Sequence, residues 1–93
     1  MALSGLITVT TAGTAVQGTA TPAVYAVAVK AHPSNSDTVW VGNDGAGDVA
    51  ATNGFPLDPG EGVVVQGDLS QYWFDADVSG EKICWLIVER PNA

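Results

Sequence analysis

The segment AVYAVAVKAHPSNSDTVWVG (residues 23–42) contains two apolar, β-branched runs on either side of a short polar stretch. Residues 23–31 and 38–42 alternate in the manner of β-strands, and neither run has the three-to-four-residue spacing of an amphipathic helix. Between them, Pro33 fixes one backbone angle, and the neighbouring Ser, Asn and Asp residues can hydrogen-bond their own backbone, which is typical of turns. The segment therefore predicts two strands joined by a turn at residues 32–37.

The same pattern recurs along the whole chain, and no segment has helical periodicity. Strands are predicted over residues 6–11, 14–17, 23–31, 38–42, 62–67, 71–77 and 82–89. Gly80 stands where the turn between the last two strands needs a positive φ, which predicts that these two strands form a hairpin. Pro91 ends the final strand before a polar tail at residues 90–93.

The chain of 93 residues is long enough for one domain and leaves little room for a second core. Short strands joined by turns, without helices, predict an all-β fold: a single small antiparallel β-sandwich or jelly-roll-like domain spanning residues 1–93. Alternate residues of a strand share one face of the sheet, and this alternation predicts one buried face. The residues predicted to line it are Ile7 and Val9, Val27 and Val29, Val39 and Val41, Val63 and Val65, and Leu86 and Val88.

A long stretch without a predicted strand, residues 43–61, is rich in Gly, Asn, Asp and Pro, which often build metal-binding or phosphate-binding loops. Its acids do not follow the spacing of a calcium loop, and its glycines do not form a phosphate-binding motif followed by a helix. We therefore predict a rigid, partly packed connector in which Phe55 and Leu57 reach the core. The sequence DPGE at residues 58–61 predicts a turn, with Pro second and Gly third.

The residue types that catalyse reactions or bind metals do not gather in a motif. His32 is the only histidine, and nothing in the sequence orients it as a base toward Ser34 or Ser36. The single cysteine, Cys84, lies in an apolar run and is predicted to be a buried, inert thiol. The sequence therefore predicts no catalytic residues, no metal site and no cofactor, and a protein that is not an enzyme.

The charge of the chain restricts its partners. The net charge is −7, and the only basic residues other than the histidine are Lys30, Lys82 and Arg90. Nucleic acids and acidic membrane surfaces need clustered basic side chains, so neither is predicted as a partner. The first eleven residues contain no basic region followed by an apolar run of signal-peptide length, so we expect a protein made in the cytoplasm.

Four segments occur in this order along the chain: TVTTAGTAVQ, AVKAHPSNSDTVWVGN, ATNGFPLDPGEGVVV and DLSQYWFDADVSGEKICWLIVE. Together they resemble small β-sandwich structural proteins of tailed bacteriophages. The resemblance covers nearly the whole chain and implies an accessory virion protein of the head-decoration or head-fibre type. Its first implication is a capsid decoration (cement) protein, located in the virion and bound to the major capsid protein or another virion protein. The alternatives are a module of a phage fibre, tail or neck, for which adhesion to carbohydrate is one option, and a cellular binding or assembly domain unrelated to virions.

Three tryptophans, Trp40, Trp73 and Trp85, each lie between two apolar residues. If those flanking residues fill the core, alternation turns all three tryptophans outward, and Ile83 and Ile87 share the face of Trp85. We therefore predict an interface made of these five residues and covered by sister subunits or by a larger shell. The analogy with decoration proteins suggests a homo-oligomer, most simply a trimer. The opposite parity, with the tryptophans inside, is the alternative.

Overall fold

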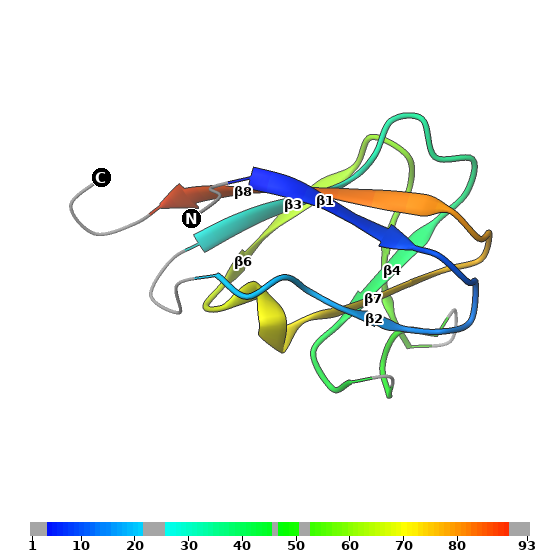
Figure 1. Cartoon of the computed structure of the whole chain (residues 1–93), viewed down its shortest axis with the longest axis horizontal. Helices are drawn as coiled ribbons and strands as arrows, with labels where there is room; N and C mark the ends of the chain where they lie inside the picture. Colours follow the sequence, from blue (N-terminus) through cyan, green and yellow to red (C-terminus); the bar gives the residue numbers. More distant parts are fainter. Residues whose placement is uncertain (1–3, 22–25, 46, 51–52, 90–93) are drawn as a thin grey trace.

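The computed structural model describes residues 4–21, 26–45, 47–50 and 53–89, and it is built almost entirely of β-strands. Eight strands form two four-stranded antiparallel sheets that pack against each other (Figure 1). A single turn of 3-10 helix, η1 (Leu69–Gln71), is the only helical element among the described residues. The predicted all-β sandwich is therefore confirmed. The predicted strand residues 23–25 and the polar tail 90–93 lie outside the described residues.

The two sheets have the strand orders β1-β8-β3-β6 (sheet A) and β2-β7-β4-β5 (sheet B). The strands of sheet A are β1 (Ser4–Val9), β8 (Glu81–Glu89), β3 (Ala26–Ala31) and β6 (Gly62–Gln66). The strands of sheet B are β2 (Val16–Gln17), β7 (Trp73–Ala76), β4 (Val39–Gly42) and β5 (Phe55–Leu57). Only β4 and β5 are neighbours both along the chain and within a sheet. The chain therefore changes sheet at nearly every connection.

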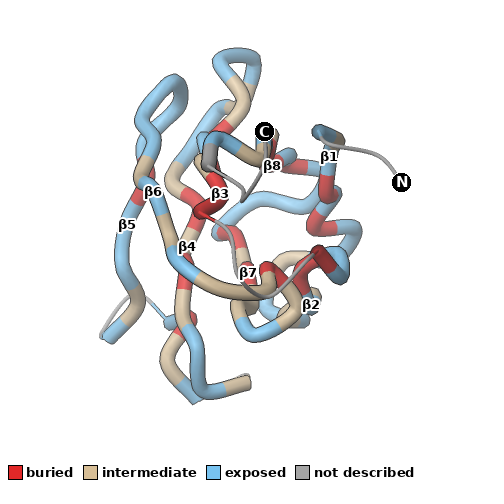
Figure 2. The backbone as a smooth tube through the Cα atoms, turned by 90° about the vertical axis from the view of Figure 1, so that its left-hand side faces the viewer, coloured by how far each residue is buried: buried red, intermediate tan, exposed pale blue. Residues whose placement is uncertain are grey.

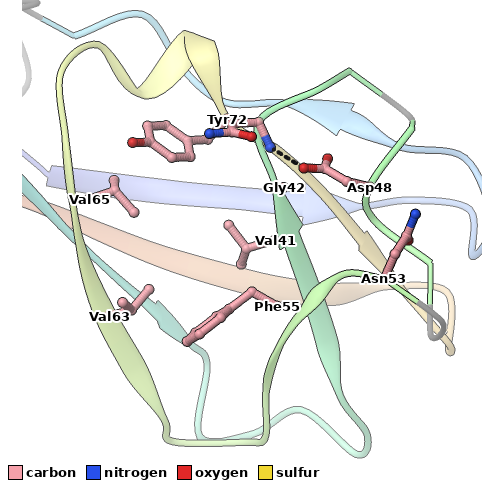
Figure 3. A pocket seen from close by; sticks show the side chains of 9 residues that line it. Val41, Gly42, Asp48, Asn53, Phe55, Val63, Val65 and Tyr72 are labelled. Atoms are coloured by element: carbon pink, nitrogen blue, oxygen red, sulfur yellow. Dashed lines mark hydrogen bonds between the residues drawn. The ribbon is translucent and has the colours of Figure 1, made fainter.

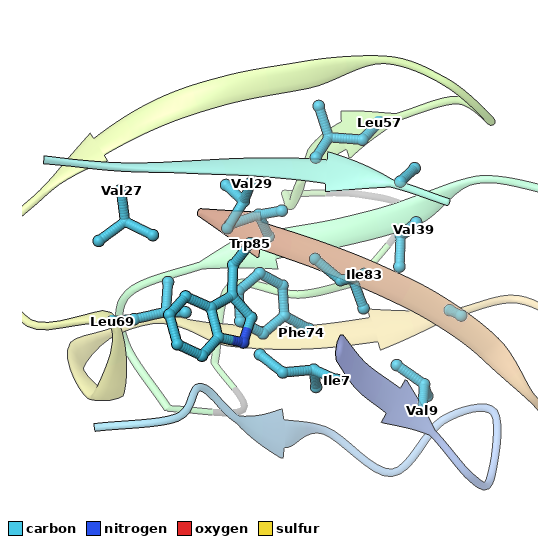
Figure 4. Close-up of a cluster of buried hydrophobic side chains, with 13 residues drawn as sticks. Ile7, Val9, Val27, Val29, Val39, Leu57, Leu69, Phe74, Ile83 and Trp85 are labelled. Atoms are coloured by element: carbon cyan, nitrogen blue, oxygen red, sulfur yellow. The ribbon is translucent and has the colours of Figure 1, made fainter. Parts of the chain in front are cut away.

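The core lies between the two sheets (Figures 2 and 4). Its buried members are Ile7, Val9, Val27, Val29, Ala31, Val39, Val41, Leu57, Leu69, Phe74, Ala76, Ile83 and Trp85. Three of the five predicted inward pairs, those of β1, β3 and β4, are confirmed as buried. Val63 and Val65 of β6 are partly buried and pack against this core at the edge of sheet A.

Strand β8 faces the core with the opposite set of residues from the one predicted. Ile83 and Trp85 are buried, whereas Leu86 and Val88 are about half exposed, at 51% and 50%. Both faces of this strand are apolar in sequence, as expected, so the alternation alone does not identify the inner face. The predicted burial of Leu86 and Val88 is therefore wrong, and so is the predicted outward orientation of Trp85.

The pairing of β8 with β1 accounts for the inward orientation of Trp85. Ile7 lies opposite Ile83, and Gly5 lies opposite Trp85. A Cβ atom on Gly5 would come within 2.9 Å of Nε1 of Trp85, which is too close for packed atoms. The glycine on β1 therefore leaves the space that the indole ring occupies inside the sandwich.

The predicted hairpin between the last two strands is wrong. Gly80 has the expected positive φ of 89°, but β7 belongs to sheet B and β8 to sheet A. The turn at residues 77–80 carries the chain from one sheet to the other. Turn chemistry reports the local backbone conformation, whereas the pairing of β8 with β1 and β3 is decided by residues far away in sequence.

The predicted connector contains a short strand that the sequence analysis missed. Residues of β5 pair with β4 at the edge of sheet B, where Pro56 is tolerated because an edge strand has one unpaired side. Leu57 is buried as predicted, but Phe55 is 54% exposed rather than inserted in the core. The predicted turn is confirmed: the N–H of Glu61 donates to the carbonyl of Asp58 at 2.8 Å, and Gly60 has a φ of 87°.

Carboxylates hold many of the loops in place. Glu81 is only 6% exposed and accepts hydrogen bonds from the backbone N–H groups of Ser36 and Asp37, at 2.9 and 3.0 Å. The carboxylates that accept at least one backbone N–H group are Asp37, Asp48, Glu61, Asp68, Asp75 and Glu81. Much of the acidic charge therefore has a structural role in satisfying loop amides.

Asp68 gives the fold a defined sensitivity to acid. Its carboxylate accepts the N–H of Thr21 at 2.8 Å and the N–H of Ser70 at 2.9 Å, and these bonds lower the pKa of Asp68 below its usual 3.8. A group whose pKa is lower in the folded state stabilises the fold above its unfolded pKa, and this contribution disappears as the pH falls through the folded pKa.

We expect the Asp68→Asn variant to be less stable than the parent protein at neutral pH. The difference in unfolding free energy should stay constant down to about pH 5 and shrink progressively below about pH 4, because the parent then loses the same charge. Urea unfolding of both proteins across this pH range measures the difference. A gap that stays constant down to about pH 2 would contradict the assigned role of the carboxylate.

Candidate interaction surfaces

The outer face of sheet A is apolar and exposed. Inner residues alternate with outer ones, so Leu6 of β1, Val64 of β6, and Leu86 and Val88 of β8 point away from the core. These four side chains are 50% to 58% exposed. Ala28 of β3 and Cys84 of β8 lie on the same side. We call this set of outward apolar residues the apolar face.

The registers of sheet A make this surface continuous. Ala28 lies opposite Leu86 on one side and opposite Val64 on the other, so three apolar residues form a row across β8, β3 and β6. Leu6 lies opposite Cys84 in the neighbouring row. Single exposed apolar residues are normal on a protein surface, whereas contiguous ones make a candidate site of interaction.

Both lysines of the chain lie on the same side of sheet A as the apolar face. Lys30 lies opposite Cys84, and Lys82 lies opposite Thr8, so the exposed lysines border the apolar rows. Among the described side chains, no carboxylate occupies an outward position on a strand of sheet A. In a chain with a net charge of −7, the described side chains on this face thus include two lysines and no carboxylate, which makes it locally basic.

Trp40 and Trp73 lie on the outer face of sheet B, in the predicted orientation. Their inward neighbours Val39, Val41 and Phe74 are buried, while both tryptophans are half-buried. Trp40 lies opposite Asp75 on β7, two residues along from Trp73, so the two indoles are diagonal neighbours. Nε1 of Trp40 donates to Oδ1 of Asp77 at 3.1 Å.

The five residues predicted as one interface do not share a surface. Trp40 and Trp73 face outward from sheet B, whereas Ile83 and Trp85 are buried between the sheets, and Ile87 is partly buried against the same core. An interface role for Ile83 and Trp85 is therefore corrected to a core role. Gly5 is the residue that could have distinguished the buried Trp85 from the two outward tryptophans. A glycine opposite a tryptophan leaves space for the indole ring on the inner side of the sheet.

A cleft of about 290 Å³ opens between the sheets at the side where β6 and β5 form the edges (Figure 3). Its apolar lining is made of Val41, Phe55, Val63, Val65 and Tyr72. One end is polar and is formed by Gly42, Asn43, Asp48 and Asn53. The sequence analysis did not anticipate this cleft, because it depends on the separation of two edge strands.

The loop between β4 and β5 uses the carboxylate of Asp48 internally. The carboxylate of Asp48 accepts the N–H groups of Asn43 at 3.0 Å and Asp44 at 3.1 Å. Asn53 donates to the carbonyl of Gly47 at 2.8 Å and closes the same loop. Within the part of the chain that the structure describes, no three His, Cys, Asp or Glu side chains are grouped so that they could hold a metal ion.

His32 forms hydrogen bonds within its own turn, and Cys84 lies on the outer side of sheet A. Nδ1 of His32 accepts the N–H of Ser34 at 3.1 Å, and Oγ of Ser34 lies 2.7 Å from the same nitrogen, so the imidazole helps to fold its own turn. Cys84 is half-buried on the apolar face rather than fully buried as predicted. No helix among the described residues is long and apolar enough to cross a membrane.

Comparisons with protein-family models, curated proteins and solved structures found no match for this chain. The resemblance to phage structural proteins therefore stays a prediction.

Proposed function

We propose that this chain is a non-enzymatic structural protein that works by docking its apolar face onto a larger protein surface. The observation that carries the proposal is the contiguous apolar face of sheet A, bordered by the only two lysines of the chain. A partner that covers Leu6, Val64 and Leu86 would remove apolar side chains from water, and this burial favours association. Carboxylates at the edge of the partner surface would pair with Lys30 and Lys82.

Together with the sequence resemblance, this surface leads us to a virion role. We propose an accessory protein of a tailed-phage particle, a capsid decoration protein that binds the outer head shell through the major capsid protein. The chain is small and has few charged residues, and carboxylates hold its loops through hydrogen bonds to backbone N–H groups. These properties suit a protein that adds a rigid cap to a shell. A trimer on the shell is proposed by analogy with decoration proteins.

The docking proposal is tested with Leu86→Asp on purified empty shells of the phage that encodes the chain. A carboxylate in the apolar row would be buried against the partner without a pair, so we expect shell binding to weaken at least about tenfold, measured by co-sedimentation. Val78→Asp is the matched control, because Val78 is exposed in the turn between the sheets. Equal binding of both variants and the parent protein would refute docking through this face.

Salt provides a second measure of the same contact. If Lys30 and Lys82 pair with carboxylates of the shell, binding should weaken as the ionic strength rises from about 0.01 M to about 0.15 M, because salt screens exposed charge pairs. The double variant Lys30→Gln and Lys82→Gln should lose this dependence while keeping the apolar contribution.

A second candidate function follows from the outer face of sheet B. Trp40 and Trp73 form a diagonal aromatic pair flanked by Asp75, Asp77 and Gln17, and aromatic rings with polar neighbours are typical of sugar-binding surfaces. This arrangement favours the carbohydrate-adhesive module of a fibre, tail or neck. Retention on a glycan array that disappears in Trp73→Ala, without binding to shells, would select this function over capsid decoration.

A further inference from the structure

Strand β6 is an edge of sheet A, and its backbone groups alternate between paired and free. The N–H of Ala31 donates to the carbonyl of Glu61 at 2.8 Å, which marks this directly opposed pair as hydrogen-bonded. Pairing alternates in an antiparallel ladder, so Val63 and Val65 bond to β3, while Gly62, Val64 and Gln66 turn their N–H and C=O groups to the free side. The hydroxyl of Tyr72 donates to the carbonyl of Gln66 at 2.9 Å, which agrees with this direction.

This edge lacks the features that usually prevent pairing with another chain. In sheet B, β2 has two residues, and β5 has three and contains Pro56. Strand β6 has five residues, GVVVQ, without a charge or a proline. No hydrogen bond between described residues outside the strand ladder uses the N–H or C=O of Gly62 or Val64. Such an edge is a template for strand addition.

The cleft described above lies directly beside the free edge. Val63 and Val65 of β6 form one wall, and Phe55 of β5 stands across from them, with Val41 between (Figure 3). A strand added to β6 would run about 4.8 Å away, and every second side chain would point toward this space. The volume of about 290 Å³ is near the lower limit of small-molecule pockets, so it suits a few side chains better than a whole cofactor.

We propose that the free edge of β6 binds an extended segment of a partner polypeptide, which adds a fifth strand to sheet A. Backbone groups of Gly62 and Val64 would hold the segment, and aliphatic residues at alternate positions would fill the cleft. This inference goes beyond the docking role of the apolar face and does not depend on it.

The partner is a different polypeptide rather than a second copy of this chain. Asp58 and Glu61 lie at the turn that precedes β6, so this end of the edge carries two carboxylates, and Asp48 lies across the cleft at its polar end (Figure 3). A second copy would bring another net charge of −7 to this place. A segment with a basic residue at the end that lies beside Asp58 and Glu61 matches the edge.

Hydrogen exchange of the free protein is the first test. The amides of Val63 and Val65 should be protected, and those of Gly62 and Val64 should exchange at the rate of an open edge. Protection of the Val64 amide at every protein concentration would show that the chain covers its own edge and would overturn the proposal. Protection that appears only on concentrating the pure protein would identify a second copy as the occupant and would overturn the choice of partner.

Binding of designed peptides is the second test. The probes are fluorescent peptides of about seven residues, with Val, Ile, Leu or Phe at alternate positions, Thr between them and a Lys at each end. We expect at least one to bind with a Kd below about 1 mM and to protect the Val64 amide. Binding that protects amides elsewhere, or no binding by the whole set, would overturn the proposal.

Two proline variants make the test specific. Val64→Pro removes a free-edge donor without removing a ladder bond to β3, and it should weaken peptide binding at least about tenfold. Thr8→Pro is the matched control on β1, the other long edge of sheet A. The N–H of His32 donates to the carbonyl of Lys82, so Lys82 of β8 bonds to β3 and the next residue, Ile83, bonds to Ile7 of β1. The backbone N–H of Thr8 therefore points to the free side of β1. Urea unfolding checks that both variants are folded. If they are folded and bind the peptides equally well, the β6 edge is not the peptide-binding site.

Discussion

Replacing Trp85 with Ala is expected to lower the free energy of unfolding by about 3–5 kcal/mol, which is the usual effect of removing a large aromatic ring from a core. Trp85 is 5% exposed and belongs to the same buried cluster as Ile7 and Phe74. A domain of this size is stabilised by only about 5–15 kcal/mol in total. The variant should therefore unfold at a much lower urea concentration, or be largely unfolded without denaturant.

Two further variants separate the role of Trp85 from a general effect of losing a tryptophan. Trp73→Ala removes the same side chain from the outer face of sheet B, where it is half-buried, and should cost clearly less. Trp85→Phe keeps a ring in the core and removes an indole N–H that has no hydrogen-bond partner among the described residues, so its loss should also be smaller. Equal, small losses for Trp85→Ala and Trp73→Ala would contradict the inward orientation of Trp85.

Replacing Glu81 with Ala is expected to lower the free energy of unfolding by about 1.5–3 kcal/mol, although the substitution removes a buried charge. The carboxylate accepts the N–H groups of Ser36 and Asp37 and lies 3.3 Å from Oγ of Ser36. Without the carboxylate, the partly buried N–H groups of Ser36 and Asp37, in the turn between β3 and β4, lose their acceptor. The cost of leaving these donors without a partner is the largest part of the expected loss of stability. Urea unfolding measures the loss directly if the dependence of the unfolding free energy on urea concentration is the same in the variant and the parent protein.

Glu81→Gln tests whether the charge or the oxygen atom matters. The amide keeps one acceptor oxygen at nearly the same position, so its loss of stability should fall between those of the parent protein and Glu81→Ala. Asp77→Ala is the exposed control, because its carboxylate accepts only the indole N–H of Trp40 among the described contacts. A Glu81→Ala variant that unfolds like Asp77→Ala would show that the turn holds its shape without the carboxylate.

The alternation of apolar residues was sufficient to predict the strands and the fold class, but not the orientation of every strand. On β3 and β4 only one face is apolar enough to form a core, so Val27, Val29, Val39 and Val41 could be placed inside. Strand β8 is apolar on both faces, and its inner side depends on its partners β1 and β3. The deciding residue, Gly5, lies at the other end of the chain.

The candidate surfaces were less accessible from sequence than the fold. The outward orientation of Trp40 and Trp73 could be predicted because each is flanked by inward residues on its own strand. The apolar face could not, because it arises from residues of four strands that are brought together only by the registers of sheet A. The cleft beside β6 requires the further knowledge that β5 and β6 belong to different sheets.

The order of strands in the two sheets has a consequence for how this chain is made. Among the described strands, β1 pairs only with β8, the last of the eight in chain order, and β8 also pairs with β3. Sheet A therefore closes only after residues 81–89 have been synthesised, and until then the apolar strands β1 and β3 are exposed to other molecules. Pairings between distant segments also make folding slow, on the order of milliseconds to seconds. We therefore expect the newly made chain to depend on a dilute or chaperoned environment until residues 81–89 have been added.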